Sequence, residues 1–140
     1  MSGDFKALSN KVYEALNSGN LALLDEVYAP DAEIHAAGRD FDRAGYKAFL
    51  QGVLNGIPDG KLEEIETFAS GDSGCTRFVL TGTLTGKQTV WPVESKGQAV
   101  KIDYAAVGHT QDGKIKELWL FTDRLALMQQ LGAIPAAVGG

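Results

Sequence analysis

Apolar side chains in the first part of the chain recur at helical spacing. Over residues 4–18 they fall three, four and one positions apart, which predicts an amphipathic helix that Gly19 ends. Residues 21–28 predict a second, short helix with Asn20 as its N-cap. Residues 32–36 alternate between apolar and polar side chains and predict a short strand.

A third apolar stripe covers residues 43–54 and predicts another helix, which Asp40 or Asp42 could cap. After this helix the period of the pattern changes from helical to strand-like, and turns that contain glycine separate the segments. The segments that predict strands are residues 61–69, 75–86, 88–94, 98–109 and 114–122.

The chain closes with a helical stretch over residues 123–131, which Gly132 ends. Helices followed by antiparallel strands with short turns predict an α+β fold rather than an alternating α/β fold. One sheet of about five strands cannot bury both faces alone, so three N-terminal helices would cover one face and leave a cavity. A length of 140 residues fits a single domain over residues 1–140.

Composition excludes several classes of protein. The 13 basic and 18 acidic residues give a net charge of −5, which repels nucleic acid and anionic membranes. No apolar run approaches the roughly 20 residues of a membrane span, and the N-terminus lacks a signal-peptide pattern, so we expect a cytoplasmic protein. Cys75 is the single cysteine, and His35 and His109 are too far apart in the sequence to form a metal-binding motif. We therefore expect no metal site.

The C-terminal third carries an ordered series of short motifs. Asp-Gly-Lys-Ile at residues 112–115 precedes Glu-Leu-Trp at residues 117–119, then Asp123, then Gln-Leu-Gly at residues 130–132. This series resembles the end of the SnoaL-like polyketide cyclases of the nuclear transport factor 2-like superfamily. Weaker similarities extend the match over roughly residues 5–132.

The resemblance implies a cone-shaped fold, with a curved antiparallel sheet around a pocket that the N-terminal helices close. It also implies a homodimer through the convex face of the sheet. We expect Leu118 and Leu120 to supply apolar side chains on that convex face. The family's chemistry implies an aldol-type closure that uses a carboxylate, with no metal and no organic cofactor.

Asp123 matches the family's acid/base carboxylate, and two interpretations of it stay open. An apolar pocket would raise its pKa and make it a useful base. Trp119 and Phe121 alternate with it on the strand, so all three would share the pocket face. Alternatively, Asp123 directly precedes a helix and would be its N-cap, and hydrogen bonds from backbone N–H groups would then lower its pKa.

Two histidines are further catalytic candidates. His35 would lie near the mouth of the pocket and could hydrogen-bond a substrate carbonyl as an enolate forms. His109 precedes Asp123 by a spacing that resembles a His/Asp pair in the family. A bulged turn after it would place His109 on the face of Ile115, Trp119 and Asp123, whereas a plain two-residue turn would place it on the opposite face.

The sequence therefore predicts a cofactor-independent cyclase or isomerase that acts on a hydrophobic, carbonyl-bearing small molecule such as a polyketide. A non-catalytic binding or dimeric scaffold protein is the alternative from another class. An epoxide hydrolase-like activity would use Lys101, Asp103 and Asp123, but the arginine of that set is absent. The residues expected to bind substrate from the helical side, or to fill the core there, are Tyr13, Leu16, Tyr46, Phe49 and Val53.

Overall fold

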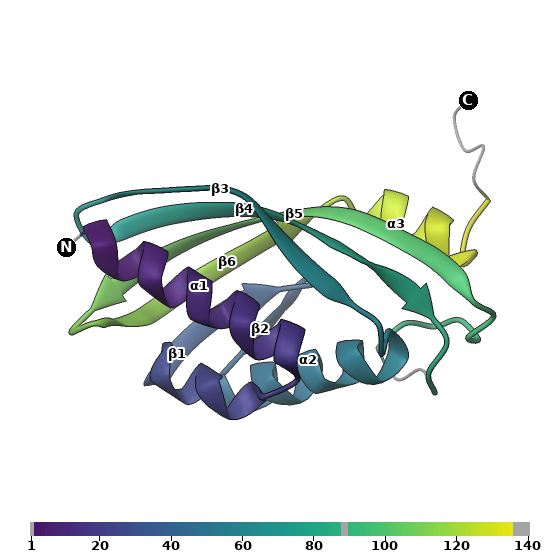
Figure 1. Ribbon diagram of the computed structural model, residues 1–140, viewed down its shortest axis with the longest axis horizontal. Helices are drawn as coiled ribbons and strands as arrows, with labels where there is room; N and C mark the ends of the chain where they lie inside the picture. The colour runs from purple at the N-terminus through teal and green to yellow at the C-terminus, as the bar shows by residue number, and fades with distance from the viewer. Residues whose placement is uncertain (1, 88–89, 136–140) are drawn as a thin grey trace.

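The structure is a computed structural model that describes residues 2–87 and 90–135, and it confirms the α+β fold. A curved six-stranded sheet has the order β2-β1-β6-β5-β4-β3, and Figure 1 shows its long strands arching over the helices. All neighbouring strands are antiparallel except β1 and β6, which run parallel. The elements are α1 (Ser2–Ser18), η1 (Leu21–Glu26), β1 (Tyr28–Ala36), β2 (Arg39–Phe41), α2 (Arg43–Gly56), β3 (Lys61–Ser70), β4 (Ser73–Leu84), β5 (Gln98–Gln111), β6 (Lys114–Thr122) and α3 (Arg124–Leu131).

The predicted helix over residues 21–28 is wrong in its last two residues. Only Leu21–Glu26 is helical, as a 3₁₀ helix, and the side chain of Asn20 makes no cap hydrogen bond. Tyr28 instead begins β1 and lies opposite Ile115 of β6, whose N–H donates to the carbonyl of Val27 at 2.8 Å. Pairing with β6 therefore makes Tyr28 the first residue of a strand instead of the last residue of a helix. The N-cap of α2 is Asp42, which accepts a hydrogen bond from the N–H of Gly45 at 2.7 Å.

The predicted strand over residues 88–94 is also wrong where it can be compared. Residues 90–93 form bends, residue 94 lies in no strand, and residues 88 and 89 lie outside the described part of the chain. The physical reason is that β4 pairs directly with β5, from Leu84 opposite Gln98 to Ser73 opposite His109, so no strand fits between them. Pro92 also lacks the N–H that a central strand donates. The segment carries Trp91, whose ring packs against Gly56 of α2.

The two ends of the space between sheet and helices are filled differently. At one end α1 approaches the sheet so closely that a Cβ on Gly74 would lie 2.2 Å from the ring of Phe5. Gly108 on the next strand makes the same room, since a Cβ there would lie 2.8 Å from that ring. Two missing side chains thus let one aromatic ring close this end, and the hollow space lies toward the other end.

A bulge in β6 decides which side chains face the helices. Thr110 lies opposite Ile115, but His109 lies opposite Glu117, so Lys116 is an extra residue on β6. Because one extra residue exchanges the two faces of a strand, Leu118 and Leu120 face the helices after the bulge. The expected faces of β6 were therefore reversed. We call the side toward the helices the inner face, marked by Tyr104, Leu118 and Leu120, and the opposite side the outer face, marked by Val107, Trp119 and Phe121.

Candidate functional site

An apolar cavity of about 120 Å³ lies between the inner face of the sheet and the helices. Of the five residues expected on its helical side, Leu16, Tyr46, Phe49 and Val53 line it, and Tyr13 does not. The hydroxyl of Tyr13 is hydrogen-bonded to Thr76, and its ring packs edge-on against Phe78. The rest of the wall comes from Val12, Ala36, Ala37, Leu50, Leu54, Gly60, Leu62, Phe78, Leu80, Val90, Trp91, Tyr104, Leu120, Thr122, Arg124 and Leu127.

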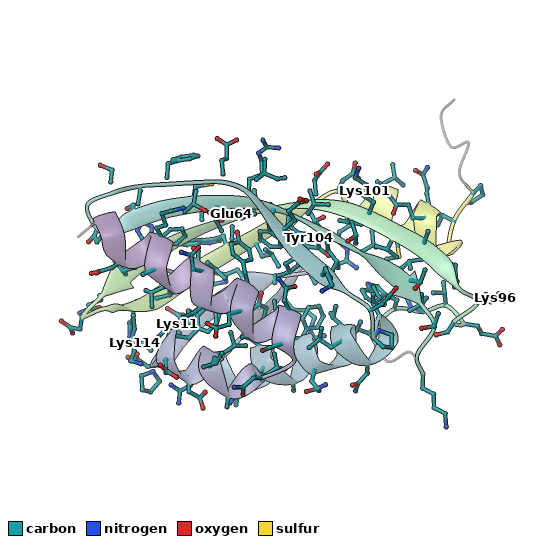
Figure 2. The ribbon with its side chains drawn as sticks, in the orientation of Figure 1. Lys11, Glu64, Lys96, Lys101, Tyr104 and Lys114 are labelled. Carbon is teal, nitrogen blue, oxygen red and sulfur yellow. The ribbon has the colours of Figure 1, made fainter. Side chains whose placement is uncertain are left out.

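Two phenols are the most buried polar side chains of this wall. Tyr46 comes from α2 and is 5% exposed, and Tyr104 comes from β5, on the side of the sheet that faces the helices (Figure 2). Burial, and then the neighbouring Tyr104, raises the pKa of Tyr46 above its usual value. Burial raises the pKa of Tyr104 to about 12, against the opposing charge of Arg124. Both phenols therefore stay protonated at neutral pH and can donate a hydrogen bond.

Neither phenol has a hydrogen-bond partner among the described residues. No fully enclosed polar side-chain atom in that part of the chain lacks a partner, so both unpaired hydroxyls must be open to the cavity or its solvent. Buried hydroxyl groups in folded proteins are nearly always hydrogen-bonded. The two phenols are therefore available to a bound molecule.

The wall of the cavity reaches the protein surface at the N-terminus of α3, where β6 ends, because Arg124 is exposed whereas the other described lining residues are buried or half-buried. Thr122 lies directly opposite Tyr104 on β5, and its hydroxyl donates to the carbonyl of Asp103 at 2.7 Å. Arg124 lines the opening, and its guanidinium forms no ion pair or hydrogen bond within the described ranges 2–87 and 90–135. This end of the cavity therefore carries an unpaired cation beside an unpaired phenol.

Asp123 has the geometry of a helix cap. Its carboxylate accepts a hydrogen bond from the N–H of Ala126 at 2.9 Å, and its side chain is exposed. Thr122 and Arg124 on either side of it line the cavity, but Asp123 does not. Of the two interpretations of Asp123, the structure shows the cap, at the opening of the cavity.

His35 lies on the outer face, away from the cavity. Its Nδ1 is 2.7 Å from Asp40 and its Nε2 is 2.8 Å from Glu117, and the ring stacks on Trp119. The hydrogen bond with Asp40, then that with Glu117, raises the pKa of His35 above its ordinary value. With both ring nitrogens engaged, His35 has no free group with which to bind a substrate carbonyl.

His109 and the two aromatic side chains of β6 also lie on the outer face. The turn that follows His109 is the plain two-residue form, with Asp112 and Gly113 both at positive φ, so His109 faces away from Ile115. The bulge also brings Trp119 to the outer face, where His109 contacts its ring edge-on and pairs with Ser73. Phe121 is 58% exposed. The expectation that Trp119 and Phe121 line the cavity is therefore wrong in placement, because the bulge turns both outward.

His109 is also distant from Asp123 along β6. His109 lies opposite Glu117, six residues before Asp123, which corresponds to about 20 Å of strand. Lys101 and Asp103 are exposed, whereas Ile102 and Tyr104 between and beyond them point inward. The structure thus brings together neither the His/Asp pair nor the epoxide hydrolase-like set.

A shallower hollow of about 350 Å³ opens on the outer side. His35, Arg39, Trp119 and Phe121 line it. The residues that it shares with the inner cavity are Ala36, Ala37, Leu120, Thr122 and Arg124. This hollow is more open to solvent than the inner cavity, and the histidine that lines it is already paired. The inner cavity is the better candidate, because enclosed and mainly apolar walls with a few polar groups are typical of small-molecule sites.

Sequence reasoning missed the two polar residues that matter most in this cavity. A signal for Tyr104 was present, since Val100, Ile102, Tyr104 and Ala106 alternate cleanly with polar or small residues along β5. No comparable signal existed for Arg124, whose place at the opening depends on how α3 leaves the sheet. The described residues contain no group of three or more His, Cys, Asp or Glu side chains that could hold a metal ion.

A model of the SnoaL-like polyketide cyclase family matches residues 6–131. The chain belongs to this family. A search of curated proteins found no match. No helix among residues 2–87 and 90–135 of this family member is both long and apolar enough to span a membrane.

Solved structures agree with the family assignment. IdmH of Streptomyces antibioticus, a candidate polyketide cyclase, is 30% identical to this SnoaL-like chain, with a TM-score of 0.76 over 91% of this chain and 97% of its own. A candidate SnoaL-like polyketide cyclase of Jannaschia sp. CCS1 has a TM-score of 0.82 at 21% identity, covering 96% and 95% of the two chains. AclR of Streptomyces galilaeus, a candidate hydroxylase, has a TM-score of 0.83 at 24% identity, covering 96% and 85%. The last two likenesses show the fold alone.

Proposed function

We propose that this SnoaL-like protein cyclises or isomerises a hydrophobic, carbonyl-bearing small molecule by acid/base chemistry that needs no metal or organic cofactor. The observation that carries the proposal is the apolar cavity with two unpaired phenols, in a chain of this family. An apolar wall favours an apolar ligand and excludes water, which strengthens every hydrogen bond inside the site. The phenols can donate to a carbonyl oxygen and so favour loss of a proton from the adjacent carbon.

Asp123 is the proposed acid/base. Its neighbours Thr122 and Arg124 line the opening, so a ligand that fills the cavity reaches the start of α3. To act as a base, the carboxylate would exchange its hydrogen bond with Ala126 for contact with the ligand. A positioned carboxylate of this kind contributes roughly 10²–10⁴-fold to proton transfer.

Hydrogen–deuterium exchange at the carbon next to the carbonyl of 1-tetralone, followed by NMR, tests this role without knowledge of the natural substrate. We expect the protein to accelerate exchange and Asp123→Asn to slow it by about 10²–10⁴-fold. Asn is also a good N-cap, so the melting temperature of that variant should hardly change. Full exchange activity in Asp123→Asn would remove Asp123 as the catalyst.

Asp123→Ala is the matched variant for the cap. It should cost about 1 kcal/mol of stability, because Ala cannot accept the hydrogen bond from Ala126. Loss of activity in both variants with loss of stability only in Asp123→Ala separates catalysis from capping. Loss of stability in both would instead assign any loss of activity to the fold.

Non-catalytic binding is the second candidate, and one observation favours it. Among the described residues that line the cavity, none carries a carboxylate or an imidazole. A binding protein would take up 1-tetralone and leave its exchange rate unchanged. This outcome would also be compatible with the fold, which supports both functions.

We further propose a homodimer through the outer face, although not through the leucines expected there. A row of register neighbours crosses this face in the order Phe68, Cys75, Val107, Trp119 and His35. Phe68 is 61% exposed, and Phe121, two residues beyond Trp119 on β6, is 58% exposed. Aromatic side chains on an otherwise paired surface are typical of protein–protein interfaces, and a second copy would cover them.

A further inference from the structure

The hollow of about 350 Å³ on the outer side, here called the outer hollow, lies at a gap in the sheet. Pairing between β1 and β6 ends at His35 opposite Trp119, whereas β6 continues to Thr122. Within the described residues, the end of β6 therefore has no strand on its β1 side. The turn after β1 is the tight two-residue form, with both residues at positive φ, and Arg39 follows it directly. The turn and the end of β6 together form the walls of the outer hollow.

Two of the four arginines of the chain line this hollow. Arg43 and Arg77 lie elsewhere, and each is paired with a carboxylate, at 3.5 and 2.9 Å. Arg39 and Arg124 form no ion pair or hydrogen bond with another residue of the described ranges 2–87 and 90–135. The chain has 18 acidic residues against 13 basic ones, so the shortage of partners is local. The two unpaired guanidinium groups therefore meet at one hollow.

An aromatic ring, rather than an acid, holds Arg39 in place. The guanidinium carbon of Arg39 lies over the ring of Phe41, 4.6 Å from its centre. A guanidinium group that lies on a ring keeps N–H groups at its edge free, and these match the two oxygens of a carboxylate. Arg39 is therefore oriented to bind an anion before one arrives.

Another wall of the outer hollow is aromatic. Trp119 is half-buried, and its ring stacks on that of His35 with centres 5.4 Å apart. Phe121 follows on the same side of β6 and is exposed. Flat rings of this kind favour contact with another planar ring. The outer hollow thus combines a cationic edge with an aromatic surface.

Negative charge near the two arginines is already engaged. Asp40 is the one carboxylate among the described lining residues, and it is 2.7 Å from Nδ1 of His35. Asp123 precedes Arg124, but its carboxylate caps α3 and does not line the hollow. Charges on more distant residues are screened beyond about 8 Å at physiological ionic strength. The local excess of positive charge therefore decides which ligand is attracted, although the whole chain is acidic.

We propose that the outer hollow binds an aromatic carboxylate. The carboxylate pairs with Arg39 and Arg124, and the ring lies against Trp119 and Phe121. The proposal goes beyond the proposed function and does not rest on it. This ligand is charged and binds from the outer side, whereas the inner cavity takes an uncharged, apolar molecule.

Two naphthalene probes test the site on the full chain by calorimetry. 2-Naphthoate carries the carboxylate, and methyl 2-naphthoate has the same ring without the charge. We expect 2-naphthoate to bind, and its affinity to fall as the ionic strength rises, because salt screens the arginine charges. Binding of methyl 2-naphthoate, an apolar ligand that suits the inner cavity, should not depend on salt. Acetate should bind at least about tenfold more weakly than 2-naphthoate, because it lacks the ring.

Arginine variants assign the binding to the hollow. Arg39→Gln should weaken binding of 2-naphthoate by about tenfold and leave methyl 2-naphthoate unchanged, because Arg39 lines the outer hollow and not the inner cavity. Arg124→Gln should weaken 2-naphthoate by a similar factor. Arg77→Gln is the matched control, since it removes the same charge from a residue that does not line the hollow, and it should change neither affinity. Trp119 and Phe121 also belong to the proposed dimer surface, so the variants keep both, and the protein concentration is held constant.

Several outcomes would overturn the site, and none of them decides the proposed function. They are absence of 2-naphthoate binding, equal losses in Arg39→Gln and Arg77→Gln, and a loss confined to Arg124→Gln, which would place the carboxylate at the inner cavity. Binding of acetate as tight as that of 2-naphthoate would overturn the aromatic part and leave a general anion site. Weaker dimerisation of Arg39→Gln, with no binding of 2-naphthoate, would mean that a carboxylate of a second copy is the occupant. Failure of methyl 2-naphthoate alone to bind would count against the proposed function and not against this site.

Discussion

The outer face of the sheet and the cavity on its inner side differ in whether their polar side chains have partners. On the outer face several charged side chains pair with one another: His35 lies between Asp40 and Glu117, and Arg77 pairs with Glu66. In the cavity on the inner side, the phenols of Tyr46 from α2 and Tyr104 from β5 are unpaired among the described residues, although their surroundings are far more apolar. Availability of a polar group, rather than its presence, therefore marks the candidate site.

The same comparison holds for the apolar side chains. Inner-face residues such as Leu118 are buried in the fold, whereas Phe68 and Phe121 on the outer face are more than half exposed. The two cavity phenols therefore lack hydrogen-bond partners among the described residues, and the rings of Phe68 and Phe121 lack a covering surface. A small ligand suits the first face, and a second protein surface suits the second.

Two adjacent residues of β6 give the most direct test of the difference between the two faces. Leu120→Trp enlarges a side chain that lines the cavity and should weaken binding of methyl 2-naphthoate by about 10–100-fold, because overfilling a packed space costs about 1–3 kcal/mol. Phe121→Trp makes a similar change one residue later, on the outer face, and should leave binding unchanged. Calorimetry on both variants measures this. Equal losses in the two variants would contradict the assignment of the faces.

These two residues also show which features of β6 the sequence can predict and which it cannot. Alternation predicted β6 correctly, but residues 118–121 are apolar at every position, so the pattern does not say which face points inward. Regular alternation from Ile115 predicts the wrong face for the later side chains of β6, because the bulge at Lys116 adds one residue to the strand. Nothing in the sequence around Lys116 specifies a bulge. The fold class, by contrast, follows from element order, which a one-residue slip does not alter.

An intermediate effect is expected for a substitution on the outer face that would weaken the proposed dimer. Phe121→Ser removes an exposed ring from the proposed dimer interface and should raise the dimer dissociation constant by about tenfold or more, as loss of an interface aromatic usually does. Analytical ultracentrifugation over a range of concentrations measures the constant. Leu125→Ser is the matched control, since Leu125 is 53% exposed on α3 rather than on the sheet. A monomer of the unsubstituted chain at micromolar concentration would rule out the dimer.

Site residues were harder to predict than elements, for a physical reason. The chemistry of their side chains makes His35, His109 and Asp123 candidates in the sequence. In the structure all three meet local partners, which are carboxylates, Ser73 and a helix N–H respectively. Titratable side chains near turns and strand ends often find such partners, and a sequence does not reveal them. Tyr104 has a less reactive side chain. It becomes a candidate because its hydroxyl has no hydrogen-bond partner among the described residues, and only the structure shows this.

The smallest expected effect is the contribution to stability of the pairing of His35 with Asp40 and Glu117 on the outer face. Asp40 and then Glu117 raise the pKa of His35 in the folded protein above that of an unfolded histidine, about 6.5. A raised pKa means that protonated His35 stabilises the fold. The contribution is fully present below about pH 6.5 and is lost as the pH rises through the folded-state value.

The measurement is the difference in melting temperature between the unsubstituted chain and His35→Gln at several pH values. Gln keeps a polar side chain without the titratable charge, and the subtraction cancels titrations common to both proteins. We expect the difference to be larger at pH 6 than at pH 9 by about 1–2 °C, because partly exposed ion pairs contribute little. Protein concentration is held constant, since dimerisation would also shift the melting temperature. A difference that grows with pH would mean that the imidazole is neutral in the fold, and that the outer face holds an available group after all.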